Sequence, residues 1–172
     1  MFYEISAEQF SCSPFELIGK DWLLICAPDK QKPCGANAMT ASWGGLGVIW
    51  SKNVATIYVR PQRHTFSLIE SCDEVSLCFP SEKYRDALML CGTRSGRDMD
   101  KISQSGLSVA HDGETPFIEQ SGVVLICKKA YSDFIKEECF NDTSHLSHYP
   151  QKDYHKLYIL EIKKILVKEK NR

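Results

Sequence analysis

Residues 37–48, NAMTASWGGLGV, are the most informative part of this chain for both its fold and its ligand. They place a threonine, a serine, a tryptophan and a glycine pair between apolar residues, and another apolar segment follows. Small hydroxyls and free backbone N–H groups can bind the polar edge or the phosphate of a flat cofactor, while an indole can cover a ring face. We therefore interpret this stretch as one wall of a cofactor site.

A second polar cluster, RPQRHT over residues 60–65, follows an apolar run at 54–59. Guanidinium groups offer paired donors that match phosphate oxygens, so Arg60 and Arg63 are candidate phosphate ligands. Thr65 is the expected N-cap of the next helix, whose start would add exposed N–H groups and the positive end of a helix dipole. Two such clusters at the ends of consecutive strands predict a single site.

Length and charge limit the classes of function. The 172 residues are enough for one domain with its own core, and we expect a single domain over residues 1–172. The formal net charge of −1 gives no field that would recruit nucleic acid or an anionic membrane, so neither is an expected partner. Glu4 and Glu8 stand where a signal peptide would be basic and then apolar, and no apolar run approaches the roughly 20 residues of a membrane-spanning helix. We expect a soluble, cytoplasmic protein.

Apolar runs bounded by turn signals predict mainly strands. The tail over 156–167 is assigned to a strand because it is rich in isoleucine and tyrosine. The other expected strands are 22–27, 39–43, 46–50, 54–59, 75–79 and 123–129. Helices are expected over 65–72, over 82–91 with Ser81 as its cap, and in a short segment toward Ile102, with Gly92 left-handed and Gly44-Gly45 forming a turn. The pattern is typical of a small closed sheet with helices packed outside.

Eight cysteines without a CxxC pair are expected to be reduced and mostly structural, because no secretory signal is recognised. Two chemical alternatives stay open. Cys34 or Cys91 could be a reactive thiol, because nearby arginines would favour a thiolate. One cysteine and three histidines could also be gathered around zinc, but their spacing matches no standard motif and we expect no metal. These four residues are Cys139, His145, His148 and His155.

Four pieces of sequence occur in an order and spacing that resemble a known family. They are MTASWGG at 39–45, VRPQR at 59–63, CG, SGRD and DK within 91–101, and DYH at 153–155. Over residues 15–167 the chain resembles the flavin reductase-like proteins with an FMN-binding split barrel, particularly the flavoredoxin-type branch. The resemblance implies a mainly β fold with peripheral helices, built on a six-stranded antiparallel Greek-key barrel. It also implies a homodimer with FMN near the subunit interface.

The resemblance assigns residues to the FMN site. Residues 39–42 would flank the isoalloxazine edge, where backbone N–H groups favour the negative charge of reduced flavin, and Trp43 would close over the ring. Arg97 and Lys101 would extend a cationic rim toward the same flavin, a twofold-related flavin or a nicotinamide phosphate. His155 would face the pocket as a proton donor or substrate contact that titrates near neutral pH. The full set of expected FMN ligands is Asn37, Met39, Thr40, Ala41, Ser42, Trp43, Arg60, Pro61, Arg63, Thr65, Ser95, Gly96, Arg97 and Lys101.

Each of these assignments has an ordinary structural alternative. A tryptophan can simply fill a core, and strand-end arginines can be solvated charges. Arg97 and Lys101 could form one helix face on which Asp98 and Asp100 balance the charge. A lone histidine such as His155 can be structural or exposed.

The sequence contains no GxSxG, HExxH, Walker or GxGxxG motif and no nucleophile–base pair. A flavin carries out hydride transfer itself, so none is required. We therefore predict an FMN-binding oxidoreductase, either a flavin reductase that uses NADH or NADPH or a flavoredoxin-like protein, with a small-molecule or protein electron acceptor. The alternatives are a flavin electron carrier without a nicotinamide site, reduced by a protein partner, and a split barrel that binds another ligand or no cofactor.

Overall fold

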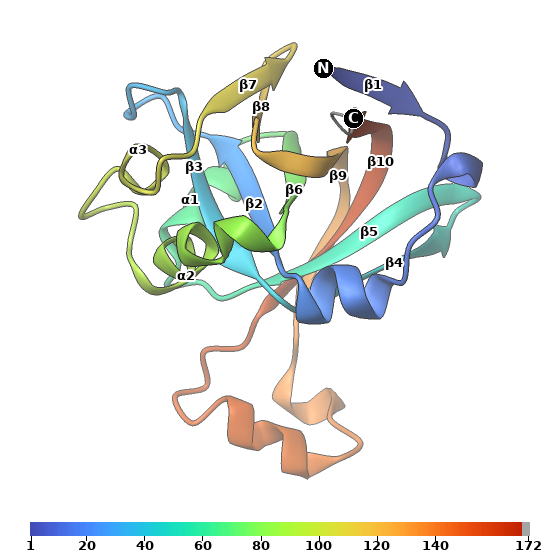
Figure 1. Cartoon of the computed structure of the whole chain (residues 1–172). Helices are drawn as coiled ribbons and strands as arrows, with labels where there is room; N and C mark the ends of the chain where they lie inside the picture. Colours follow the sequence, from blue (N-terminus) through green and yellow to red (C-terminus); the bar gives the residue numbers. More distant parts are fainter. Residues whose placement is uncertain (170–172) are drawn as a thin grey trace.

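The computed structural model describes residues 1–169, which form one strongly curved antiparallel sheet with helices on its outside and a projecting arm (Figure 1). The strands are β1 (Phe2–Ile5), β2 (Leu23–Pro28), β3 (Ala36–Ala41), β4 (Gly44–Ile49), β5 (Lys52–Val59), β6 (Glu74–Pro80), β7 (Val109–Asp112), β8 (Thr115–Ile118), β9 (Ser121–Phe134) and β10 (Lys156–Lys168). The α-helices are α1 (His64–Glu70), α2 (Arg85–Thr93) and α3 (Lys101–Gln104). Short 3₁₀ turns lie at Ala7–Gln9, Glu82–Tyr84, Glu137–Cys139 and Thr143–His148, and a π-helix spans Phe15–Lys20.

The sheet curls until its two ends come together. Its strands are hydrogen-bonded in the order β3-β2-β6-β9-β10-β5-β4, and β1 pairs with β10. Because neighbouring strands are about 4.8 Å apart, a flat sheet would separate β3 from β4 by about 29 Å. Only Ser42 and Trp43 connect these strands, and so short a connection reaches about 11 Å. The sheet therefore closes without a β3–β4 ladder among residues 1–169, which makes it a split barrel.

Strand β2 is buried on both faces and separates two apolar clusters. Leu23 and Ile25 point into the barrel, where they meet residues of β3, β5, β6, β9 and β10. Leu24 and Cys26 alternate with them and pack on the other side, beneath α2, α3 and β8. This arrangement explains why β2 reads as a continuous apolar run rather than an alternating one.

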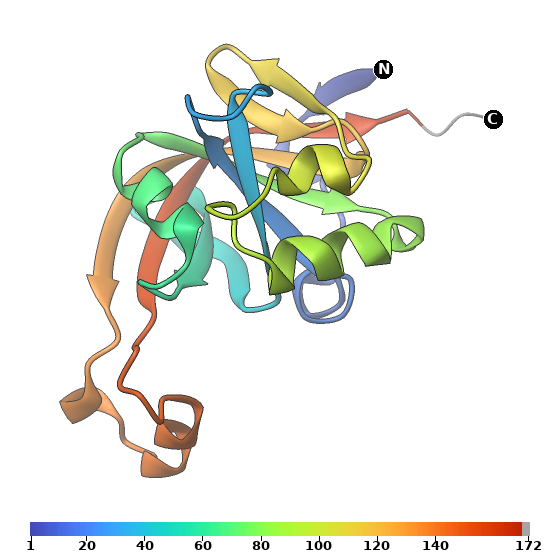
Figure 2. The same cartoon turned by 90° about the vertical axis from the view of Figure 1, so that its left-hand side faces the viewer.

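Helix α2 is fastened to β3 on the outside of the barrel, as Figure 2 shows. The Thr40 hydroxyl donates to the Leu88 carbonyl oxygen. Gly92 lies in the last turn of α2, and a Cβ atom there would be 3.3 Å from the Thr40 Cβ. The expected left-handed conformation of Gly92 is therefore wrong, because this glycine serves close packing of the helix on the strand.

Residues 135–155 leave the barrel between β9 and β10 and project from it (Figures 1 and 2). We call this segment the arm. Within it only Tyr149 and His155 are buried, with 6% and 9% of their surface exposed. The arm therefore has little core of its own and depends on its contacts with the end of the barrel.

The expected mainly β, split-barrel class is confirmed, and five of the seven expected strands match β2, β4, β5, β6 and β10 closely. The strand expected at 123–129 is β9, which continues to Phe134 at the base of the arm. The strand expected at 39–43 is β3, which begins and ends earlier. The sheet has eight strands rather than the six that the resemblance implied, because β1 adds to β10 and β4 adds to β5. The separate β7–β8 hairpin carried no clear alternation and was not expected.

The turn expected at Gly44-Gly45 is also wrong. Gly44-Gly45 begins β4, where a Cβ on Gly44 would lie 2.6 Å from the Thr56 carbonyl oxygen, so glycine is needed for close pairing. The real turn is at Trp50 and Ser51, whose φ angles of 52° and 55° suit the tight hairpin between β4 and β5. No helix within residues 1–169 is long and apolar enough to cross a membrane.

Candidate functional site

A cleft of about 320 Å³ lies at the split, between the end of β3 and the base of the arm. Its walls combine the β3–β4 connection, the end of β5, the end of α2 and the start of β10. The lining residues are Met39, Thr40, Ala41, Ser42, Trp43, Tyr58, Arg60, Arg63, Gly92 and His155. The structure thus brings the two polar clusters of the sequence into one site, together with His155.

The backbone of β3 is itself a source of polar groups. This strand is paired on one side only, with β2, so alternate N–H and C=O groups of its free edge face away from the sheet. The side chain of Thr40, in contrast, already donates to Leu88 and holds α2 in place. Ser42 is therefore the hydroxyl of this stretch that remains for a ligand.

Trp43 lies at the mouth of the cleft and is not a core residue, since 43% of its surface is exposed. Its ring centroid is 5.0 Å from that of His155 and 5.6 Å from that of His148. The indole thus bridges the barrel and the arm, in a position to cover a planar ligand.

His155 is a neutral group at neutral pH. Burial, together with the charge of Arg60, lowers its pKa to about 4. The Nδ1 atom lies 2.9 Å from the Tyr149 hydroxyl oxygen. The expectation that His155 titrates near neutral pH is therefore wrong, because the imidazole is too poorly solvated to hold a charge.

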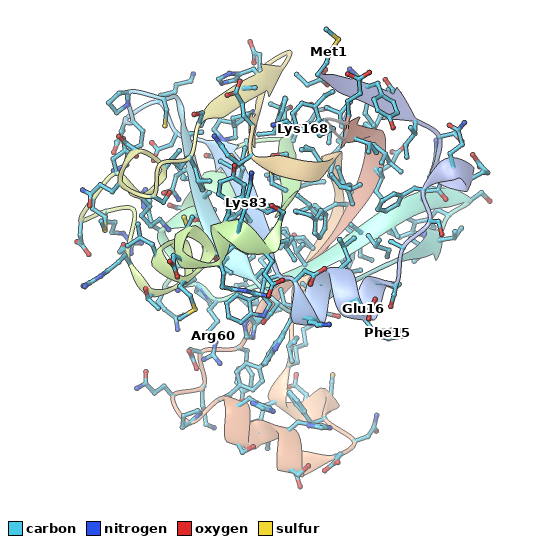
Figure 3. All side chains as sticks on the ribbon, in the orientation of Figure 1. Met1, Phe15, Glu16, Arg60, Lys83 and Lys168 are labelled. Carbon is cyan, nitrogen blue, oxygen red and sulfur yellow. The ribbon has the colours of Figure 1, made fainter. Side chains whose placement is uncertain are left out.

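The positive charge of Arg60 is balanced by a carboxylate of the arm. Its guanidinium pairs with the Asp153 carboxylate, and its Nη2 atom donates to the His148 carbonyl oxygen at 2.9 Å. Gln62 donates to the same Asp153 oxygen at 2.6 Å. These hydrogen bonds lower the pKa of Asp153 and keep it ionised. Figure 3 shows Arg60 where the arm leaves the barrel, so this residue joins the two parts.

Arg63 and Lys101 form a second, uncompensated cationic group, which we call the cation pair. Arg63 donates to the carbonyl oxygens of Gly92 at 2.8 Å and Cys91 at 3.4 Å. Lys101 is only 3% exposed and donates to the same Cys91 oxygen at 3.1 Å. Burial lowers the pKa of both, that of Lys101 to about 8.

No carboxylate of residues 1–169 forms an ion pair with either member of the cation pair. The balanced helix face considered for Lys101 is therefore absent. Asp100 instead caps α3 by accepting from the Ser103 N–H at 3.2 Å. The carbonyl oxygens at the end of α2 carry only partial negative charge, so the cation pair leaves net positive charge beside the cleft.

Several expected ligands lie behind the cleft and not in its wall. Asn37 is 2% exposed and donates to the Thr65 hydroxyl at 2.8 Å. Thr65 is therefore not the N-cap of α1; the helix begins one residue earlier, at His64, and Arg63 is its N-cap. A Cβ on Gly96 would be 2.3 Å from the Asn37 Oδ1 atom. Asn37, Thr65 and Gly96 therefore hold β3, α1 and the 94–100 loop together.

The remaining expected ligands are at the surface of that loop or turn. Pro61 is exposed, and the Ser95 hydroxyl accepts from the Arg97 N–H at 3.2 Å. The Arg97 side chain is exposed and donates to the Gln62 carbonyl oxygen at 3.2 Å. None of the three lines the cleft.

Tyr58 and Gly92 are the lining residues that the sequence analysis missed. Counting every second residue back from Arg60 along its strand reaches Tyr58, so strand periodicity could have identified it. Gly92 carries no comparable signal, because its role depends on the packing of α2 against β3.

The structure describes the surroundings of all eight cysteines and of the histidines considered for zinc. All eight cysteines lie within the described residues and are free. Burial raises the pKa of Cys91, which argues against a reactive thiol there. Within residues 1–169 no three His, Cys, Asp or Glu side chains are grouped to hold a metal ion. His145 and His148 instead stack, with their ring centroids 6.4 Å apart.

Comparison with known proteins identifies the family of the chain. The model of the flavin reductase like domain matches residues 19–172. The chain belongs to this family. No curated protein matches it.

Three solved structures illustrate the shared fold. An FMN-binding domain of a flavin reductases-like enzyme from Shewanella baltica is 15% identical, with a TM-score of 0.68 over 97% of this chain and 77% of its own. Flavoredoxin from Methanosarcina acetivorans is 20% identical, with a TM-score of 0.66 over 87% and 69%. The styrene monooxygenase flavin reductase from Pseudomonas putida S12 is 10% identical, with a TM-score of 0.64 over 87% and 80%.

Proposed function

We propose that this chain binds FMN in the cleft and acts as an NAD(P)H-dependent flavin reductase or a flavoredoxin-like oxidoreductase. The observation that carries the proposal is the cation pair. Arg63 lines the cleft and shares the Cys91 carbonyl oxygen with the buried Lys101, yet neither has a carboxylate partner in the described chain. A phosphate is the ligand that such a pair lacks, because its oxygens accept charge-assisted hydrogen bonds.

The rest of the cleft fits a flavin ring. Its volume of about 320 Å³ lies at the lower end of the range for cofactor sites, and it is open on one side. The free edge of β3 offers backbone donors and acceptors to the polar edge of the ring, with Ser42 beside them. Trp43 can cover the ring face. The solved relatives that are named as FMN-binding or as flavin reductases support the same ligand.

FMN, when bound, would supply hydride and electron transfer. The N–H groups on the β3 edge would favour negative charge on the ring, which makes reduction easier. Trp43 and the arm would limit the access of water to the ring. We infer NADH or NADPH as the electron donor and a small molecule or a protein as the acceptor.

The charges around the cleft favour NADH over NADPH as the donor, and they are also compatible with an electron carrier. Arg97 lies outside the cleft, and the charge of Arg60 is balanced by Asp153, so neither arginine offers the cleft an unpaired charge for a 2′-phosphate. If the single cation pair is occupied by FMN, NADPH gains no charge partner. A carrier that is reduced by a protein would need no nicotinamide pocket at all.

We also propose a homodimer, as the family resemblance implies. Apolar side chains are exposed on the β4–β5 hairpin and at the base of the arm, including Val48 at 72% and Trp50 at 58%. A second groove of about 350 Å³ lies beside Phe134 and Phe140. A second copy would bury such surface. Sedimentation velocity of the full chain tests this, and a monomer at micromolar concentration would contradict it.

The function is tested by an anaerobic visible spectrum of the full chain with one equivalent of FMN, before and after addition of NADH and then NADPH. Loss of the flavin band at about 450 nm with NADH alone is the expected result. A bound flavin that neither nicotinamide reduces but dithionite does would favour the electron carrier. Absence of FMN binding would reject the flavin assignment.

A further inference from the structure

Tyr149 is the more deeply buried of the two buried residues in the arm. It follows the last 3₁₀ turn of the arm and has 6% of its surface exposed. Its ring forms a cluster with those of Tyr154, at a centroid distance of 4.9 Å, and Phe140, at 6.1 Å, which are themselves 6.2 Å apart. The Arg60 guanidinium lies 5.3 Å from its centroid. These contacts fix the phenol in one orientation.

The Tyr149 hydroxyl has a single hydrogen-bond partner within residues 1–169, the Nδ1 atom of His155 at 2.9 Å. A phenol is a stronger hydrogen-bond donor than a neutral imidazole N–H, and an unprotonated imidazole nitrogen is a stronger acceptor than a phenol oxygen. The favoured arrangement therefore has the Tyr149 O–H donating to Nδ1. The ring proton of neutral His155 then lies on Nε2.

The Nε2 atom has no hydrogen-bond partner in the described chain, although His155 lines the cleft beside Trp43. The Nδ1 edge of the ring is turned to the arm, so the Nε2 edge is the one left for the cleft. The charged groups that face this ring are Arg60 and Asp153, and burial with Arg60 keeps the imidazole neutral. At neutral pH its Nε2 proton is therefore available for a hydrogen bond, while the imidazolium form is scarcely populated.

We propose that Tyr149 is a positioning residue that fixes the proton of His155 on Nε2, so that His155 presents an N–H donor to a carbonyl oxygen or ring nitrogen of a planar heterocycle in the cleft. The identity of that heterocycle rests on the proposed function, whereas the proton position does not. The nicotinamide carboxamide and the flavin ring both carry such acceptors. His155 would then select and orient ligands rather than donate a proton to them.

The proton position can be measured directly by long-range ¹H–¹⁵N correlation spectra of the ¹⁵N-histidine-labelled full chain without ligand. The five histidines are separated by comparison with His155→Gln, whose spectrum lacks the signals in question. We expect His155 to show the Nε2–H pattern without change from pH 5.5 to 8. A proton on Nδ1, or titration within this range, would overturn the proposal.

Tyr149→Phe is the decisive variant, and Tyr154→Phe is its matched control. Tyr154 belongs to the same aromatic cluster, but its hydroxyl donates to Glu137 at 2.8 Å and not to His155. Tyr149→Phe should convert His155 to a mixture of both tautomers, whereas Tyr154→Phe should leave it unchanged. Equal spectra for the two variants would contradict a positioning role. If Tyr149→Phe fails to fold, the wild-type spectrum still decides the proton position.

The consequence for ligands is measured in the same variants. Tyr149→Phe should lower kcat/KM for NADH by about 2- to 10-fold, the range for one neutral hydrogen bond, when the heterocycle is the nicotinamide, and should lower the affinity for FMN and for riboflavin by the same factor when it is the flavin. An unchanged kcat/KM and an unchanged flavin affinity with an altered tautomer would reject the ligand contact. If the chain binds no FMN at all, the proposed function fails, while the tautomer measurement stands on its own.

Discussion

Arg60 and Arg63 occupy the same six-residue segment and line the same cleft, but their surroundings differ in charge. Arg60 faces the arm and is paired with Asp153, which Gln62 also contacts. Arg63 faces the end of α2, where its partners are carbonyl oxygens and its neighbour is the buried Lys101. One arginine thus completes a structural joint, and the other leaves positive charge for a ligand. Both residues are arginines, so their different roles depend on the groups that the arm and the end of α2 place beside them.

The sharpest test of this contrast is FMN titration of Arg63→Ala and Arg60→Ala, followed by quenching of flavin fluorescence. We expect Arg63→Ala to weaken FMN binding by about 10- to 100-fold, the range for lost charge-assisted hydrogen bonds. Arg60→Ala should change it by no more than about threefold, since its charge is already balanced. Riboflavin, which lacks the phosphate, is the control ligand. Equal losses for the two variants, or an equal loss for riboflavin, would refute the assignment of the phosphate to Arg63.

The free energy of unfolding of Lys101→Met tests whether the cation pair is a binding group or a structural one. The pKa of Lys101 falls from 10.5 to about 8 on folding, so the unfolded chain binds more protons between these values and stability rises with pH across them. The cost of burying this charge is therefore fully present below pH 8. We expect Lys101→Met to stabilise the ligand-free protein by about 1–3 kcal/mol at pH 7, and the gain to vanish toward pH 10.5.

Urea unfolding at pH 7 and at pH 10 measures this difference, and FMN binding should weaken in the same variant. Lys30→Met is the control, because the Lys30 side chain is exposed and forms no ion pair within residues 1–169. A variant that is less stable than the wild type at pH 7 would mean that Lys101 is a net stabilising residue. The cation pair would then be structural.

The sequence analysis succeeded where local patterns decide the structure. Apolar runs located most strands, and residues 39–43 meet Arg60 and Arg63 in one cleft as expected. The predictions were wrong where a residue's role depends on contacts with a segment far away in the sequence. Thr65 is a residue type that commonly caps helices, but its hydroxyl accepts a hydrogen bond from Asn37. Gly44 is a residue type common in turns, but here it allows β4 to pair closely with β5. His155 resembles a neutral-pH acid until the burial by Tyr149 and Trp43 is known.

The smallest expected effect concerns the joint between Arg60 and the arm. Hydrogen bonds from Arg60 and Gln62 lower the pKa of Asp153 below its usual range. A carboxylate with a depressed folded-state pKa contributes its stabilisation above the unfolded value of about 3.9, and this is lost as the pH falls through the folded value. Asp153→Asn should therefore loosen the arm at pH 7 and make no difference near pH 2.

Hydrogen exchange of peptides from residues 145–155, corrected for the intrinsic rate at each pH, measures the opening of the arm. We expect about two- to fivefold faster exchange in Asp153→Asn than in the wild type at pH 7, a size typical of a partly exposed ion pair. Glu138→Gln removes an exposed arm carboxylate that has no ion pair in the described residues, and should have no effect. A persistent difference between Asp153→Asn and the wild type at pH 2 would show that the joint depends on the shape of the side chain. In that case Arg60 would be held by packing against Tyr149, and its charge would be freer to meet a ligand than the pairing with Asp153 implies.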